Sequence, residues 1–223
     1  MKKKTGRIVR KAAKRPRRVK PAPRRKSAVP AARSAAAPDD TKPAVRRLRN
    51  RLAQALARIE ELQAHANTDF LLNIPNRRGF EHELQRSISY IKRYHASGAL
   101  IVIDVDRLKP INDVFGHAAG DQVLKGIVAV LLGQVRSSDV IGRLGGDEFA
   151  LLLWNLSETD AHAKAAALEE AIDRLTFTFR GRTLSAGASA GVAILGPNAE
   201  AGRALEEADR AMYVRKAQRR HET

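Results

Sequence analysis

The sequence Arg143-Leu144-Gly145-Gly146-Asp147-Glu148-Phe149 joins two short apolar segments, 140–144 and 149–154. The segments have the length and composition of β-strands, so the glycines predict a tight hairpin between them, with glycine supplying a positive φ. Asp147 and Glu148 would then lie side by side at the hairpin tip.

A second acidic pair follows the β-branched segment 98–105, which predicts a buried strand ending at Asp104 and Asp106. If this strand neighbours the hairpin, Asp104 and Asp147 converge at one end of a sheet. Converging carboxylates beside a glycine loop suit a hard cation such as Mg²⁺, and Mg²⁺ beside a phosphate indicates phosphoryl or nucleotidyl transfer. The chain has neither a G-x-x-x-x-G-K-[ST] phosphate loop nor a G-x-G-x-x-G fingerprint.

The remaining pattern predicts an α+β fold in which helices pack against a mostly antiparallel sheet. Asp106 is expected to cap the short helix that follows it. The expected helices cover 76–94, 107–114, 118–135, 158–175 and 200–219, and two further strands cover 175–179 and 183–195 around a turn at 180–182.

Charge divides the chain of 223 residues into two parts. Residues 1–50 contain 19 Lys and Arg and only two acids, a net charge of +17, and the remaining residues contain 22 of each sign. The chain has no Cys, which excludes disulfides and thiolate metal sites. It also has neither a secretory signal nor an apolar run near the roughly 18 residues that cross a bilayer, so we expect a cytoplasmic protein without a transmembrane segment.

Residues 1–43 are rich in Ala, Pro, Lys and Arg and have too few apolar side chains to form a core. The composition predicts a disordered basic tail. Such a tail suits polyanions, namely nucleic acid, an anionic membrane surface or ribosomes, through salt-sensitive and non-specific binding. The alternative is a solvated tail without a specific partner.

The segment 44–68 carries apolar residues at alternating spacings of three and four. This pattern fills the a and d positions of three heptads and predicts a helix that forms a parallel dimeric coiled coil. The alternative is an amphipathic helix lying on its own domain. The stripe consists of Val45, Leu48, Leu52, Ala55, Ile59, Leu62 and Ala66.

The motifs together resemble the GGDEF family, the diguanylate cyclases, over residues 69–220. Besides Gly145-Gly146-Asp147-Glu148-Phe149, the sequence Asp104-Val105-Asp106-Arg107-Leu108-Lys109 resembles the family's D-x-D-x-F-K. Residues 111–121 match I-N-D-x-x-G-H-x-x-G-D, residues 76–78 match N-R-R, and residues 189–193 match the late strand. The order and spacing agree throughout.

The resemblance implies a palm-like, nucleotide-cyclase-like fold for a domain covering 69–223. It also implies the condensation of two GTP into cyclic di-GMP with release of two pyrophosphates, by a homodimer with Mg²⁺ or Mn²⁺. Asp104, the carbonyl of Val105 and Asp147 would hold the metal. Asp147 or Glu148 would assist deprotonation of the 3′-hydroxyl, and Lys109 would neutralise phosphate.

The resemblance further assigns the substrate side chains. Asn112 and Asp121 would read the guanine edge, which Leu108 would support, and Gly145 and Gly146 would let the backbone approach the ribose and the α-phosphate. Lys216 and Arg220 would neutralise phosphates. Arg136-Ser137-Ser138-Asp139 resembles the R-x-x-D site at which cyclic di-GMP inhibits the family, so Arg136 and Asp139 are the expected product site; the alternative is a charged surface turn.

The chain departs from the family pattern in three places. Leu72-Asn73 replaces Thr-Gly, Leu108 replaces Phe, and Arg219-Arg220-His221 replaces Gly-Arg-Asn. The metal and guanine residues are all present, which favours an active cyclase. The alternative is an inactive GGDEF module that acts as a GTP or cyclic di-GMP receptor, with the basic tail as its output or anchor.

Overall fold

The computed structural model describes residues 41–222. The predicted tail lies outside this range except for its last three residues, which already belong to the first helix. The helices are α1 (Thr41–Asn67), α2 (Arg77–Tyr94), α3 (Leu108–Phe115), α4 (His117–Gly133), α5 (Glu158–Asp173) and α6 (Ala201–Glu222). The strands are β1 (Gly98–Asp106), β2 (Val140–Arg143), β3 (Glu148–Trp154), β4 (Thr176–Phe179), β5 (Arg182–Ser185) and β6 (Gly187–Leu195).

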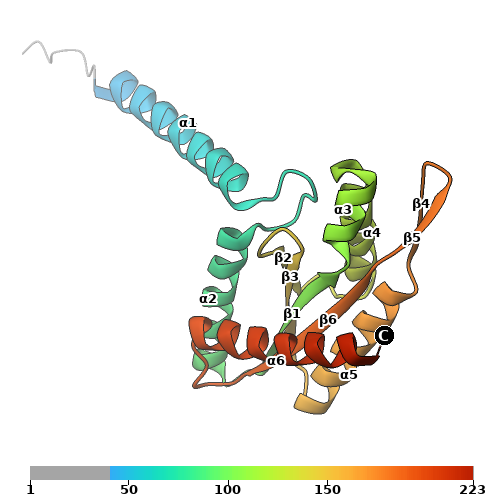
Figure 1. Cartoon of the computed structure of the whole chain (residues 1–223). Helices are drawn as coiled ribbons and strands as arrows, with labels where there is room; N and C mark the ends of the chain where they lie inside the picture. Colours follow the sequence, from blue (N-terminus) through green and yellow to red (C-terminus); the bar gives the residue numbers. More distant parts are fainter. Residues whose placement is uncertain (1–40, 223) are drawn as a thin grey trace, which may run out of the picture. The chain divides into compact units, whose positions relative to one another are not determined.

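The main sheet has four antiparallel strands in the order β2-β3-β1-β6, and β4 and β5 form a separate hairpin (Figure 1). The α+β, palm-like fold predicted from the sequence is confirmed, and β1 does neighbour the 143–149 hairpin. Strands β1 and β3 occupy the centre of the sheet, with Asp104 opposite Glu148. Asp104 and Asp106 at the end of β1 and Asp147 and Glu148 at the start of β3 therefore lie at the same end of the sheet.

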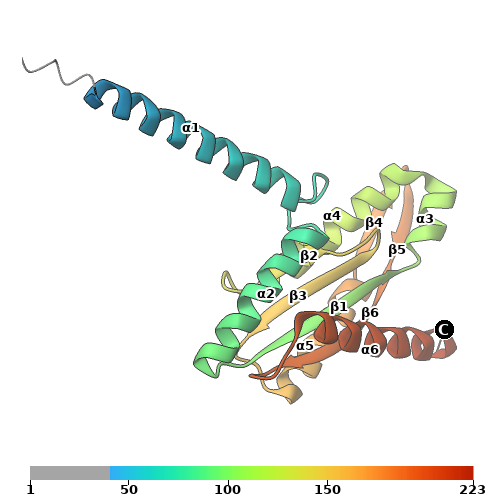
Figure 2. The ribbon, with the colours of Figure 1, turned by 90° about the vertical axis from the view of Figure 1, so that its left-hand side faces the viewer.

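Helices cover both faces of this sheet, with α2 and α6 on the side that faces the viewer in Figure 2. One apolar core joins Ile101 and Ile103 of β1 to Val123 and Ile127 of α4 and to α5. The other core joins Leu100 and Val102 of β1 to α2 and α6. Because successive side chains of a strand point to opposite faces, the unbroken apolar run of β1 feeds both cores.

Helix α6 packs closely on β6 because Gly191 lacks a side chain. A Cβ at Gly191 would lie 2.1 Å from both the carbonyl oxygen of Ala208 and the amide nitrogen of Met212, which is closer than real Cβ contacts come. The glycine therefore fixes the distance between the helix that carries Lys216 and the central strands.

Two local predictions were wrong. Asp106 does not cap α3: Arg107 is the N-cap residue, at φ 69°, and no side chain caps the helix there. The side chain of Asp106 instead accepts a hydrogen bond from the Ser189 hydroxyl, at 3.0 Å. In the 143–149 hairpin, Gly145 and Gly146 are not at positive φ; the positive-φ glycines of the described residues are Gly116 and Gly181.

The segment 183–195, expected as one strand, is divided at Ala186. Its first part pairs with β4 and its second part pairs with β1. The turn at Arg180 and Gly181 has both residues at positive φ, as a two-residue type I′ hairpin requires. One apolar run thus serves two sheets, which a single-strand interpretation of the pattern missed.

Helix α1 covers the segment expected to be helical, and its apolar stripe is exposed. The side chains from Val45 to Leu62 on this stripe include Leu48 and Leu52, which are 65% and 60% exposed. No helix among residues 41–222 combines the length and hydropathy needed to cross a membrane.

Candidate active site

The site lies at the end of the sheet where β1 ends and β3 begins. Asp104 lies opposite Glu148 across β1 and β3, and the amide of Val105 donates to the carbonyl oxygen of Asp147 at 2.9 Å. The convergence of Asp104 with the hairpin acids, expected from the sequence, is therefore present. Asp104 is 7% exposed, whereas Asp147 and Glu148 are half-buried.

The grouped carboxylates disfavour their own ionisation. Burial raises the pKa of Asp104, the hydrogen bond and charge of Lys216 oppose this change, and the nearby charges of Asp147 and Asp106 add to it. Burial also raises the pKa of Glu148, opposed by Arg77. A cation bound among these oxygens would relieve both effects, because it favours the charged form of each carboxyl.

A pocket of about 540 Å³ opens beside these acids. Lys216 of α6 reaches over it and forms an ion pair with Asp104. The pocket brings together six residues predicted for the site: Val105, Leu108, Lys109, Asp147, Lys216 and Arg220. Its other lining residues, which had no predicted role in the site, are Asp106, Arg107, Pro110, Gly187 and Arg219. Five of the lining side chains are cationic, so the pocket suits a polyphosphate.

The donor set fits one hard divalent cation. No group of three or more His, Asp or Glu side chains within residues 41–222 is placed to bind a metal by itself. Asp104 and Asp147 supply carboxylate oxygens, Val105 supplies a carbonyl oxygen, and the rest of the shell would fall to substrate oxygens or water. The buried Asp104 carboxylate already holds a positive charge, the Lys216 ammonium, which agrees with a cation site.

Asn112 and Asp121 are not among the residues that line this pocket. The Oδ1 atom of Asn112 is buried without a hydrogen-bond partner, so the side chain has a free acceptor. It sits against α4 where Gly120 leaves room for it: a Cβ on Gly120 would come within 2.0 Å of Oδ1. Asn112 therefore lies against Gly120, the residue directly before Asp121.

Three side chains that the sequence analysis did not assign hold the hairpin in place. Arg143 donates from Nη2 to the carbonyl oxygen of Gly146 at 2.7 Å and from Nε to that of Gly145 at 3.0 Å, and its Nη1 lies 3.0 Å from Asp69 Oδ2. Arg77 donates to the carbonyl oxygen of Leu144 at 2.8 Å. Their only signal in the sequence was their position inside or beside the matched motifs.

Asn73 explains why the first departure from the family pattern is tolerated. It adopts φ 54°, in the left-handed region where glycine is the usual residue and asparagine is among the least strained alternatives. The neighbouring Leu72 is buried in the core. The replacement of Thr-Gly by Leu-Asn therefore preserves the backbone of this turn.

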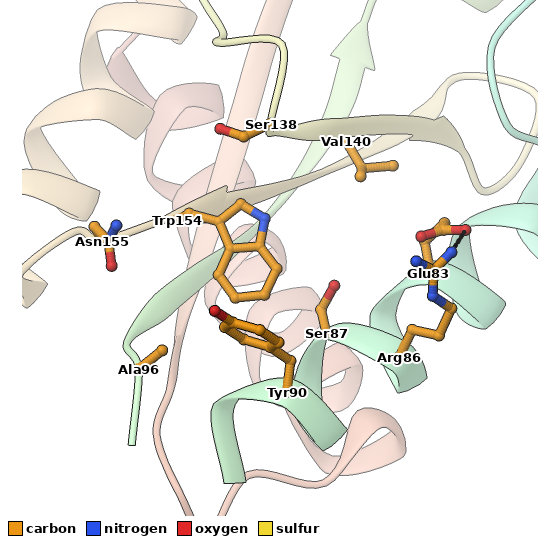
Figure 3. A pocket seen from close by; sticks show the side chains of 9 residues that line it. All are labelled: Glu83, Arg86, Ser87, Tyr90, Ala96, Ser138, Val140, Trp154 and Asn155. Atoms are coloured by element: carbon orange, nitrogen blue, oxygen red, sulfur yellow. Dashed lines mark hydrogen bonds and ion pairs between the residues drawn. The ribbon is translucent and has the colours of Figure 1, made fainter. Parts of the chain in front are cut away.

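The expected product site lies at the opposite end of the sheet, before β2. Both carboxylate oxygens of Asp139 accept backbone hydrogen bonds, from Arg136 at 2.8 Å and from Trp154 at 3.2 Å, while the Arg136 side chain is exposed. A pocket of about 530 Å³ adjoins this turn (Figure 3). Its lining includes Ser138 and the rings of Tyr90 and Trp154, which meet edge to face with centroids 5.5 Å apart.

The antiparallel sheet, the acidic strand ends and the cation-lined pocket define a palm-like domain of the nucleotide-cyclase type. Residues 66–222 match the family profile described as diguanylate cyclase, GGDEF domain. The chain belongs to the GGDEF family.

Relatives and solved structures of this family resemble the chain over most of its length. It is 40% identical to diguanylate cyclase TpbB of Pseudomonas aeruginosa over 161 residues, which cover 71% of this chain and 37% of TpbB. It is 38% identical to the probable diguanylate cyclase DgcE of Escherichia coli over 159 residues, 71% of this chain and 14% of DgcE. The chain thus spans well under half of these two relatives.

The coiled coil and GGDEF domain of Caulobacter crescentus DgcB, solved in complex with c-di-GMP, superimposes with a TM-score of 0.66 at 26% identity. The match covers 77% of this chain and 95% of that one.

Proposed function

We propose that this chain is a diguanylate cyclase that condenses two GTP into cyclic di-GMP and releases two pyrophosphates. The observation that carries the proposal is the meeting of Asp104 with Asp147 at the strand ends, beside a pocket lined by Lys109, Lys216 and Arg220. Carboxylates that hold a cation and side chains that neutralise phosphate are what nucleotidyl transfer needs.

The metal would be Mg²⁺ or Mn²⁺, held by Asp104, Asp147 and the carbonyl of Val105. When bound, it would neutralise phosphate charge and make the 3′-hydroxyl easier to deprotonate. Glu148, whose pKa burial raises, lies next to this set and is a candidate to accept the proton. Lys109, Lys216 and Arg220 would neutralise the charge on the leaving pyrophosphate.

Guanine would bind between α3 and α4. Asn112 and Asp121 would read the guanine edge, and the carboxylate of Asp121 would accept hydrogen bonds from the N1–H and amino group of guanine, both of which adenine lacks at those positions. Leu108 would support the base. At the hairpin, a Cβ on Gly146 would meet no protein atom within 4 Å, which leaves open space for the nucleotide.

The active form would be a homodimer, because one site holds one GTP and the product has two-fold symmetry. The exposed stripe of α1 supports a dimer: Leu48, Leu52, Ile59 and Leu62 are about half exposed or more in the single chain. Pairing two such stripes in a coiled coil would bury them and raise the effective concentration of one site at the other.

Cyclic di-GMP would inhibit the enzyme at Arg136 and the adjoining pocket. The exposed guanidinium of Arg136 is free to grip a guanine edge or a phosphate, and Tyr90 and Trp154 offer aromatic faces for a base. For Asp139 to bind the nucleotide as well, its carboxylate oxygens would have to accept a further hydrogen bond besides the two that they accept from the backbone.

The second candidate function is a receptor for GTP or cyclic di-GMP that does not turn over. It is favoured by the preformed aromatic pocket at the product site and by the replacement of Gly-Arg-Asn with Arg219-Arg220-His221. In either function, the basic residues before α1 would bind a polyanion, such as nucleic acid or an anionic membrane surface.

The test is incubation of the full chain with GTP and Mg²⁺, followed by mass spectrometry for cyclic di-GMP, with Asp147→Ala alongside. Product from the wild type and none from the variant would support the cyclase and its metal site. Absence of product from a wild type that still binds cyclic di-GMP would favour the receptor.

A further inference from the structure

Strand β6 lies at an edge of the main sheet, yet carboxylates of α5 satisfy two of its outward amides. Asp173 Oδ1 accepts a hydrogen bond from the amide of Ala188 at 3.3 Å, and Glu169 Oε1 accepts one from the amide of Ala190 at 2.8 Å. The two acceptors are one helical turn apart and the two amides are two residues apart. The spacing of the helix thus matches that of the strand edge, which would otherwise be open to pairing.

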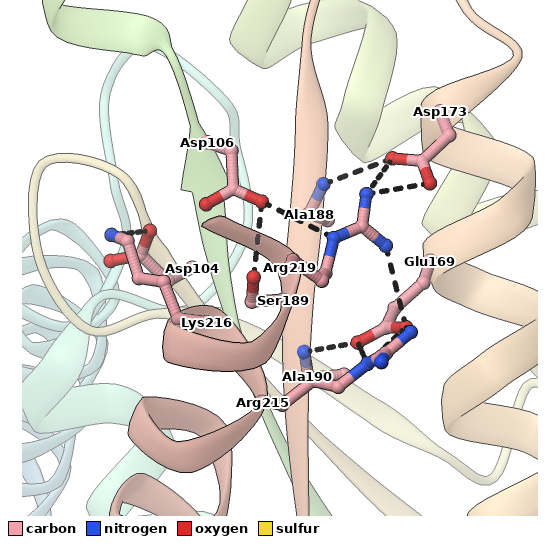
Figure 4. A network of polar contacts seen from close by, with 10 residues as sticks. All are labelled: Asp104, Asp106, Glu169, Asp173, Ala188, Ser189, Ala190, Arg215, Lys216 and Arg219. Carbon is pink, nitrogen blue, oxygen red and sulfur yellow. Dashed lines mark hydrogen bonds and ion pairs between the residues drawn. The ribbon is translucent and has the colours of Figure 1, made fainter. Parts of the chain in front are cut away.

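Each of these carboxylates also receives an arginine from α6 (Figure 4). Arg215 Nη2 lies 3.0 Å from Glu169 Oε2, and Arg219 Nη2 lies 2.7 Å from Asp173 Oδ2 and 2.8 Å from its Oδ1. We call these four residues the edge clamp. It joins α5 and α6, which cover opposite faces of the sheet, across the edge strand.

The two arginines share Glu169, since Arg219 Nη1 lies 3.5 Å from Glu169 Oε2, but they differ in what else they touch. Arg219 Nε also lies 3.8 Å from Asp106 Oδ2, and its side chain lines the candidate polyphosphate pocket, whereas Arg215 is absent from that lining. Gly187 adjoins this ion pair: a Cβ there would lie 3.1 Å from Asp173 Oδ1 and 3.4 Å from Arg219 Nη2, so a side chain at this position would crowd the pair.

The end of α6 has few other anchors. Met212 is its last buried residue, and residues 213–221 are exposed or half-buried. Yet this end carries Lys216 and Arg220, both in the pocket lining. A helix end without buried side chains frays easily, so polar contacts decide where these two cations sit.

We propose that Arg219 is a positioning residue: by bridging Asp173 and Asp106 it holds the end of α6 so that Lys216 and Arg220 face the triphosphate of GTP. This inference rests on the proposed function. It also gives a role to the residue that stands where the family pattern has glycine. At the end of α6, where no side chain of residues 213–221 is buried, the ion pairs of the clamp hold the helix in place.

The experiment compares Arg219→Gln with Arg215→Gln in the full chain. Both variants remove one arginine from the clamp on the same helix, one turn apart, but only the first changes the pocket lining. The probe is the α,β-methylene analogue of GTP with Mg²⁺, which binds but cannot release pyrophosphate. We expect Arg219→Gln to weaken its binding about tenfold, the scale of one lost charged hydrogen bond, and Arg215→Gln to change it less than about twofold.

A double-mutant cycle separates positioning from a merely structural effect. If Arg219 acts through Lys216, then Arg219→Gln should weaken binding about threefold or less in a Lys216→Ala background, because the two losses overlap. Independent losses that simply multiply would overturn the proposal. Should Arg215→Gln fail to fold, Asp173→Asn, which neutralises the carboxylate nearest to Arg219 without changing the pocket lining, should weaken binding in the same direction as Arg219→Gln.

Hydrogen exchange at residues 213–222 provides a readout without nucleotide. Faster exchange there in Arg219→Gln than in the wild type supports the clamp, and equal exchange overturns it. A wild type that does not bind the GTP analogue contradicts the proposed function. If the wild type and Arg219→Gln bind the analogue equally tightly, this inference is contradicted but the proposed function is not.

Discussion

Arg143 Nη1 lies 3.0 Å from Asp69 Oδ2, which joins the first turn of the domain to the hairpin 74 residues later. Both side chains are largely buried, and the same guanidinium also holds the carbonyl oxygens of Gly145 and Gly146. The other oxygen of Asp69 accepts the amides of Leu71 and Leu72, at 3.0 and 2.9 Å. One ion pair therefore fixes both the turn after α1 and the loop that carries Asp147.

Replacing Arg143 with Ala should lower the free energy of unfolding by about 2 kcal/mol, because it removes hydrogen bonds from a charged donor and leaves Asp69 partly buried. Urea unfolding followed by circular dichroism measures the change. Arg86→Ala, which removes an exposed arginine on α2 paired with Glu83, is the control and should cost less than about 1 kcal/mol. Equal losses in the two variants would contradict a special role for Arg143.

Asn73→Gly and Asn73→Ala should differ in stability. At φ 54°, the Cβ of alanine is strained against the backbone, asparagine tolerates this conformation better, and glycine has no Cβ to be strained. We expect the free energy of unfolding of Asn73→Ala to be about 1 kcal/mol lower than that of the wild type. That of Asn73→Gly should stay within about 0.5 kcal/mol of the wild-type value. Thermal and urea unfolding of both variants provide the measurement, and equal stability would refute the strain.

Glu148→Gln should stabilise the protein increasingly as pH rises. Burial raises the pKa of Glu148 above its ordinary value of 4.5, so the folded state binds its proton more tightly than the unfolded state does. Stability from this group is therefore present at pH below 4.5 and is lost as pH rises through the folded pKa.

The difference in unfolding free energy between Glu148→Gln and the wild type should grow over that window and then level off. Urea unfolding at several pH values, without divalent ions, measures it. Glu83→Gln, at a half-buried site on α2 where Glu83 pairs with the exposed Arg86, is the control and should show no such trend. A constant difference from pH 4 to 8 would contradict the raised pKa.

Arg136→Ala should relieve inhibition by cyclic di-GMP, because it removes the exposed guanidinium beside the aromatic pocket. The inhibition constant should rise at least about tenfold, while the rate without product stays within about twofold, since the site lies at the far end of the sheet from Asp147. Inhibition curves with added cyclic di-GMP measure this. Arg93→Ala, at an exposed position near the end of α2, is the matched control; unchanged inhibition in Arg136→Ala would exclude this site.

Leu52→Glu should disrupt the proposed dimer. It places a charge in the exposed stripe of α1, where two copies would meet, so we expect more monomer and less activity at low protein concentration. Sedimentation and activity over a concentration series measure both. Gln54→Glu adds the same charge on the same helix away from the stripe and should behave as the wild type; a Leu52→Glu variant with wild-type self-association would refute the coiled coil.

The sequence alone determined the fold class and the main acidic residues. The alternation of apolar strands and amphipathic helices is a local property, and the spacing of Asp104, Asp147 and Glu148 within recognisable motifs carried their assignment. It also located the helix with the apolar stripe, because a repeat of three and four is visible without any tertiary contact.

What distant residues do together depends on tertiary contacts. Asp106 looked like a helix cap, but folding places it beside Ser189 and Arg219, more than 80 residues away. The single apolar run 183–195 divides because its two halves meet different partner strands. Ion pairs such as Arg143 with Asp69 and Arg219 with Asp173 leave no periodic trace in the chain, since they depend on which surfaces the packed core brings into contact.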